Sequence, residues 1–177
     1  MSLRKMLFTV VAFVSCVSFA GAQIFIIKDG VSTGYKPGSV VSVPGSGQTN
    51  TAVMFNNTKI GLDSGAGYSF EEVQYQGKKA LSIKSLGEGV IIIGDTVIKT
   101  GKGVSTLLLT PDDNGGLQVE VLKGNVSFLN KKSKASGTVY EGQKFSILDL
   151  EYNQSLDTSA FDAKRDLFVT QLSASNP

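Results

Sequence analysis

The sequence predicts an all-β protein, either an antiparallel sandwich or a stacked, solenoid-like β-sheet domain, with a short C-terminal helix. Three observations support this fold class. Between residues 23 and 150, short apolar runs alternate with turn-forming residues. Several runs place apolar side chains at every second position, as a half-buried strand requires. The chain also has 20 glycines, which suits many tight turns.

Three strands are expected in the N-terminal part. The first is the apolar run 24–28, which an Asp-Gly pair ends. The second lies within 40–43, between two Pro-Gly pairs, and the third is 52–55, before an Asn-Asn pair. Because residues 24–27 are all apolar, we expect this strand to be able to add to the sheet edge of a neighbouring molecule.

The central and C-terminal strands follow the same alternation of apolar runs and turns. Residues 111–116 are polar and glycine-rich, so we expect them to form a loop. The expected strands are 68–75, 81–86, 90–93, 96–98, 104–110, 117–121, 126–128, 139–140 and 145–150.

The tail, residues 151–177, differs in pattern from the β-rich part, residues 23–150. Ser159 and Asp162 have the spacing of a helix cap. An imperfect helical stripe of apolar residues accompanies them, formed by Phe161, Ala163, Leu167, Phe168 and Leu172. We expect a short helix at about 159–172, and a frayed tail is the alternative, because short helices depend on packing.

Residues 1–22 have the pattern of a secretory leader. Arg4 and Lys5 precede an apolar run, and small residues lead up to an expected cleavage between Ala22 and Gln23. The run has about 14 residues, short of the roughly 20 that a membrane-spanning helix needs. We therefore expect no membrane span in the mature chain. Acylation of Cys16, within a loose lipoprotein box, is the minor alternative.

Removal of this leader changes the charge and cysteine content of the chain. The whole chain has 17 basic and 15 acidic residues, and loss of Arg4 and Lys5 leaves 15 of each. This balance gives no basis for nucleic-acid binding, which favours a basic face. The only cysteine also leaves with the leader. An exported chain without disulfides is more typical of a bacterium, in the periplasm or at the cell surface.

The residue types also argue against catalysis. The chain has no histidine and the mature part has no cysteine, which removes the commonest general base and the thiol nucleophile. The acidic run 112–114 suits a turn better than a calcium site. The aromatic side chains of Tyr68, Phe70 and Tyr75 suit a core better than a sugar-binding face. We expect no enzyme activity and no cofactor.

Residues 58–150 contain motifs that resemble the FecR family of periplasmic β-domains. Residues 94–101 and 104–107 are similar to the family's G-x-x-V-x-T-G entry and the following strand. Residues 119–128 resemble its V-x-V-x-x-G-x-V-x-V hairpin, and residues 139–143 match its V-x-x-G-Q ending. The resemblance implies a periplasmic β-domain that acts through protein contacts.

One departure from the family concerns signalling. FecR-like regulators of sigma factors join a cytoplasmic helical domain and a membrane helix to this β-domain, whereas here the leader runs almost directly into strands. We therefore expect an exported binding module that contacts an envelope protein. A self-assembling structural subunit is the alternative.

Overall fold

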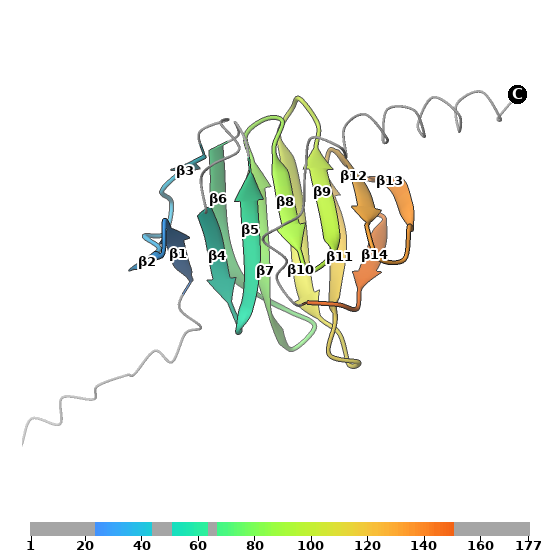
Figure 1. The fold of residues 1–177 in the computed structure, drawn as a ribbon, viewed down its shortest axis with the longest axis horizontal. Helices are drawn as coiled ribbons and strands as arrows, with labels where there is room; N and C mark the ends of the chain where they lie inside the picture. The colour runs from blue at the N-terminus through green and yellow to red at the C-terminus, as the bar shows by residue number, and fades with distance from the viewer. Residues whose placement is uncertain (1–23, 44–50, 64–66, 151–177) are drawn as a thin grey trace, which may run out of the picture.

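A computed structural model describes residues 24–43, 51–63 and 67–150, which form two antiparallel β-sheets (Figure 1). This confirms the all-β prediction. The leader with Cys16, the cleavage site Ala22–Gln23 and the expected helix 159–172 lie outside the described residues.

The larger sheet has eight strands and the smaller has six. In spatial order, the larger sheet contains β13 (Ser136–Tyr140), β12 (Asn125–Asn130), β9 (Thr96–Thr100), β8 (Val90–Ile93), β5 (Thr58–Asp63), β4 (Thr51–Phe55), β1 (Phe25–Lys28) and β2 (Val31–Gly34). The smaller contains β14 (Lys144–Ile147), β11 (Leu117–Lys123), β10 (Ser105–Pro111), β7 (Lys78–Ser85), β6 (Gly67–Tyr75) and β3 (Val41–Ser42).

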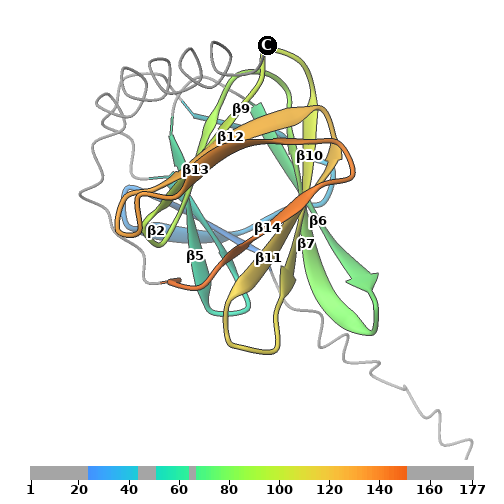
Figure 2. The same cartoon turned by 90° about the vertical axis from the view of Figure 1, so that its right-hand side faces the viewer.

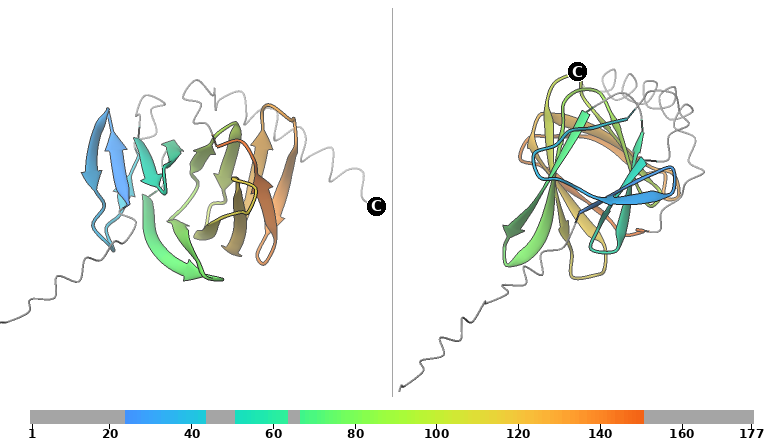
Figure 3. Two further views of the ribbon diagram at one scale, coloured as in Figure 1. Left: turned by 90° about the horizontal axis from the view of Figure 1, so that it is seen from below. Right: turned by 90° about the vertical axis from the view of Figure 1, so that its left-hand side faces the viewer.

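Successive hairpins alternate between the two sheets. The hairpin β4–β5 belongs to the larger sheet, β6–β7 to the smaller, β8–β9 to the larger and β10–β11 to the smaller. The two sheets face each other when the molecule is seen from its ends (Figures 2 and 3). The chain therefore progresses along the molecule from β1 to β13, adding each hairpin beside the one placed two hairpins earlier.

Two-residue turns close several of these hairpins. Asn56 and Asn57 have φ values of 46° and 61°, and together they join β4 to β5. Gln76 and Gly77, with φ values of 51° and 75°, join β6 to β7 in the same way. Positive φ at both turn positions matches the right-handed twist of the flanking strands, so these pairs fix the hairpin register.

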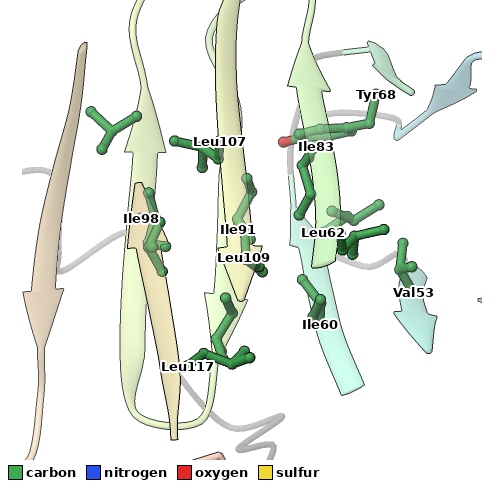
Figure 4. Packing of buried hydrophobic residues seen from close by; sticks show 14 of the residues in the cluster. Val53, Ile60, Leu62, Tyr68, Ile83, Ile91, Ile98, Leu107, Leu109 and Leu117 are labelled. Atoms are coloured by element: carbon green, nitrogen blue, oxygen red, sulfur yellow. The ribbon is translucent and has the colours of Figure 1, made fainter. Parts of the chain in front are cut away.

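The inner faces of the two sheets share one apolar core (Figure 4). Strand register places Ile60 beside Ile93 in the larger sheet and Ile83 beside Leu107 in the smaller. All four side chains are buried in the same cluster. Burial of this many branched side chains, at about 1.5–3 kcal/mol each, is the main force that holds the sheets together.

Buried polar groups join the two sheets where the chain crosses between them. The Ser85 hydroxyl, at the end of β7, lies 3.1 Å from the Thr100 hydroxyl, at the end of β9. Both hydroxyls also donate to the carbonyl of Gly87, at 2.7 and 2.8 Å. These bonds satisfy a crossover carbonyl that would otherwise be costly to bury.

Tyr68 makes a second polar link between the sheets. Its hydroxyl, carried by β6, donates to the carbonyl of Val90 on β8 at 3.2 Å. Burial raises the pKa of Tyr68 well above its usual range. The folded state therefore favours the protonated phenol. As pH rises above the ordinary tyrosine pKa, the phenol ionises more readily in the unfolded chain, so the free energy of unfolding falls.

After β14 the chain returns across the hairpin β8–β9. A Cβ at Gly94, in the turn of that hairpin, would lie 1.9 Å from the carbonyl oxygen of Asp149. The Asp149 carboxylate also accepts a hydrogen bond from Lys132 at 3.1 Å. Glycine at position 94 therefore permits a close backbone crossing that any side chain would block.

The strand prediction was incomplete in two places and wrong in one interpretation. Strands β2 and β5 were not expected, although both are present. The run 24–27 was expected to be available to a neighbouring molecule. Instead, β1 is paired on one side with β2 and on the other with β4, so its backbone is already used within the sheet.

Replacement of Gly94 by alanine should destabilise the fold more than the same change at Gly30. Both glycines have positive φ, but a Cβ at Gly30 would meet no atom within 4 Å. Gly30→Ala should therefore cost only the backbone strain, about 1 kcal/mol. Gly94→Ala should cost about 1–3 kcal/mol more, because Asp149 must move. Urea unfolding measures both, and equal losses would contradict the close crossing.

Candidate functional site

A cleft lies beside strand β6. This strand is in the half of the molecule that carries β1, β2 and β3 (Figure 1). The volume of the cleft is about 900 Å³. We call it the β6 cleft. Its lining comes from the residue before β1, from the end of β2 and the segment after it, and from β6, β7 and β10 of the smaller sheet. It consists of Ile24, Gly34, Tyr35, Pro37, Gly38, Ser69, Phe70, Glu71, Glu72, Ser82, Lys84 and Thr106.

Tyr35 fixes the wall of the β6 cleft against the strand. Its ring meets the ring of Phe70 edge-on, with centroids 5.3 Å apart and planes at 84°. Its hydroxyl accepts the backbone N–H of Phe70 at 3.1 Å and donates to the carbonyl of Ser39 at 2.6 Å. The phenol oxygen thus takes the place that a strand carbonyl would occupy beside β6.

Within residues 24–43, 51–63 and 67–150, strand β6 has no strand partner along most of the side that faces this wall. Among the described residues, its partner β3 pairs only with Gly67 and Tyr68. The Phe70 N–H points to this side, and in an antiparallel strand backbone groups alternate between the two sides. The N–H and C=O groups of Glu72 and Gln74 therefore point the same way as that of Phe70. We call this side, at Phe70, Glu72 and Gln74, the β6 edge.

The side chains around the cleft combine apolar and charged character. Phe70 is buried and Tyr35 is half-buried, so the wall is largely apolar. Glu71 and Lys84 are exposed on the polar side. The carboxylate of Glu72 is 3.3 Å from Lys79. Such a surface suits an extended peptide with alternating apolar and polar side chains better than a uniformly charged ligand.

The structure separates the three aromatic residues that the sequence brought together. Tyr68 and Phe70 are buried in the core, as expected. Tyr75 is half-buried, and its hydroxyl donates to the carboxylate of Glu120 at 3.1 Å. That hydrogen bond raises the pKa of Tyr75. The three side chains do not form a common stacking surface.

The acidic run 112–114 forms a turn held by its own hydrogen bonds. The Asp112 carboxylate accepts the backbone N–H groups of Asn114 and Gly116, at 2.9 and 2.7 Å. Asp113 pairs with Lys78 at 2.6 Å, and this contact lowers the pKa of Asp113. The Asp112 carboxylate thus stabilises the turn, and the Asp113 carboxylate forms an ion pair. Over residues 24–43, 51–63 and 67–150, no group of three or more acids is arranged to hold a metal ion.

Comparison of the chain with known protein families, with curated proteins and with solved structures gave no match. Within the part of the chain that the structure describes, no helix has the length and hydrophobicity needed to cross a membrane.

The sequence did not reveal the β6 cleft or its wall. Tyr35 lies in a stretch that the alternation of apolar residues left unassigned. Only the paired register of β3 with β6 shows where the ladder stops. The one available signal was the short apolar segment 40–43, which is too brief to cover a nine-residue strand.

Loss of the Tyr35 hydroxyl should weaken the fold modestly. Tyr35→Phe removes the acceptor for the Phe70 N–H, and one such bond contributes about 1 kcal/mol. Tyr140→Phe, at a side chain that is 58% exposed, is the control and should change stability by less than about 0.5 kcal/mol. Thermal unfolding of both variants is the measurement. Equal stabilities would show that the hydrogen bond between the Tyr35 hydroxyl and the Phe70 N–H, which we call the Tyr35 clamp, does not stabilise the fold.

Proposed function

We propose that this protein is an exported, non-enzymatic binding module of the bacterial envelope, which holds an extended segment of a partner protein at the β6 edge. The observation that carries the proposal is a side of β6 that no other described strand pairs with beyond Tyr68, next to a cleft of about 900 Å³. The main chain of the partner supplies hydrogen bonds, and its side chains supply specificity.

The geometry of β6 suits strand addition. Backbone donors and acceptors at Glu72 and Gln74 repeat at the two-residue period that an added antiparallel strand requires. The clamp by Tyr35 ends this stretch at Phe70. An incoming segment therefore lies along β6 between the Tyr35 clamp and Tyr75. Of every two successive side chains of this segment, one is directed at the β6 cleft.

The location of the protein in this proposal rests on the sequence. The leader pattern of residues 1–22 supports export, with cleavage between Ala22 and Gln23, to the periplasm or cell surface. The FecR-like motifs within residues 58–150 support a role in protein contacts. The absence of histidine from the chain supports a binding role over a catalytic one.

A proline at the β6 edge should block partner binding. In Gln74→Pro, the edge loses a donor that the ladder with β7 does not use, and proline is tolerated at strand edges. Gln74→Ser keeps the donor and is the matched control. Capture of the partner from an envelope extract should fall about tenfold with Gln74→Pro alone, a loss of about 1.4 kcal/mol. Equal capture by both variants contradicts strand addition.

The alternative function is self-assembly through the outer strand of the larger sheet. In the described residues β2 pairs only with β1, and Val31 is 64% exposed. An unpaired strand of this kind is a template for a second copy. Sedimentation of the mature protein should show concentration-dependent growth if β2 mediates assembly, and Val31→Lys should abolish it. A monomer at all concentrations rules this function out.

The intact mass of the exported protein tests its processing. Cleavage after Ala22 should give a chain that begins at Gln23 and carries no lipid. A mass increased by several acyl chains, on a chain that begins at Cys16, would instead place the protein on a membrane surface. Cys16→Ala should leave the processing unchanged in the first case and prevent it in the second.

A further inference from the structure

The outer face of the larger sheet carries a continuous apolar row. Strand register places one small or apolar residue of each of six neighbouring strands directly opposite the next. The row consists of Ile27, Ala52, Gly61, Ile92, Val97 and Leu129. Adjacent strands lie about 4.8 Å apart, so the row extends roughly 24 Å across the sheet. We call it the outer row.

The outer row is separate from the core between the sheets. Ile91 and Ile93 belong to the core, so their neighbour Ile92 points to the opposite face. Ile92 and Val97 belong to a second apolar cluster, which also includes Val90 and contacts Leu129. Strand β8 is thus apolar on both faces, a pattern typical of strands that are covered on both sides.

The outer row is also closed to solvent at its centre. Val97 is 0% exposed and Ile92 is 8% exposed. By contrast, the outer face of the smaller sheet carries Ser82 and Lys84, beside the exposed Glu71. A solvated outer face of that polar kind is usual in an antiparallel sandwich. The larger sheet therefore has an apolar, solvent-closed strip on its outer face, whereas the outer face of the smaller sheet is polar.

The described chain ends at the turn of β8–β9, the hairpin that carries two residues of the outer row. Asp149 lies against Gly94 in the turn of β8–β9. The first pair after that turn is Ile93 with Thr96, and the second is Ile92 with Val97. The contact with Lys132 holds Asp149 at this corner. Leu150 packs against the core between the sheets, so the described chain ends at the tip of the hairpin β8–β9, which carries Ile92 and Val97.

We propose that the tail of this same chain, residues 151–177, covers the outer row. The tail has 27 residues, and its apolar stripe includes Leu167 and Phe168. A helix of about 14 residues is about 21 Å long, close to the extent of the row. The direct connection through Leu150 gives the tail a high effective concentration at this face, which favours it over a second copy or a membrane.

Engineered cysteines test this contact directly. Once Cys16 is replaced by alanine, the chain has no other cysteine, so any added pair is unambiguous. Leu129→Cys with Phe168→Cys joins the outer row to the tail stripe. Ser82→Cys with Phe168→Cys is the matched control on the outer face of the smaller sheet. On mild oxidation, the first pair should form an intramolecular disulfide at least about tenfold faster than the control.

The products of oxidation show whether the tail or a second copy of the chain covers the outer row. A fast-migrating monomer with no free thiols supports the proposal. A disulfide-linked dimer would assign the row to a second copy and overturn it, as would equal rates for the two pairs. If Leu129→Cys impairs folding, Ala52→Cys at another position of the row replaces it.

Dye binding provides a second, independent measurement. Leu167→Asp with Phe168→Asp should release the tail from the outer row and increase the fluorescence of an apolar-surface dye. Thr170→Asp with Ser173→Asp adds the same charge outside the stripe and should leave the fluorescence unchanged. Equal responses of the two double variants would overturn the proposal.

Discussion

The structure depends on one apolar layer between the two sheets. Each sheet is open-edged and would expose a row of branched side chains if it stood alone, and burial of both inner faces removes this cost at once. Because hairpins alternate between the sheets, this layer joins residues that are distant in sequence. Ile60 and Leu107 illustrate the distance that the chain covers within a single core. Loss of either sheet would therefore unfold the other.

Because hairpins alternate between the sheets, backbone polar groups in the crossovers need hydrogen-bond partners outside the strand ladders. Each crossover takes backbone groups out of one ladder before they enter the next, so their hydrogen bonds need other partners. Thr100 and Ser85 provide these partners in the crossover from β7 to β8, and Tyr68 provides one where the same crossover enters β8. These three hydroxyls are buried because the topology places unpaired backbone carbonyls beside them.

Sheet edges are the other consequence of an open two-sheet fold. An unpaired edge is a hazard that proteins cover, shorten or use. The run 24–27 is protected inside the larger sheet by β2. Among the described residues, pairing of β6 with β3 ends after Tyr68, and the phenol of Tyr35 accepts the N–H of Phe70 beyond it. The edge that remains beyond it is the basis of the binding function proposed above.

The sequence by itself determined the fold class and much of the strand content. Alternation in residues such as Leu117, Val119 and Val121 requires a half-buried strand in any packing. The pair Asn56–Asn57 tolerates the positive φ that a tight hairpin requires. Such local signals specify strands and turns because they act over a few residues.

Only the tertiary structure decided which sheet each strand joins and where pairing stops. A two-residue period shows which side chains share a face, but it does not identify the neighbouring strand. For that reason β5, with Lys59 and Gly61 in its alternate positions, was missed, and β1 was assigned to the wrong environment. The β6 edge and the outer row arise from pairing between distant segments, which no local pattern encodes.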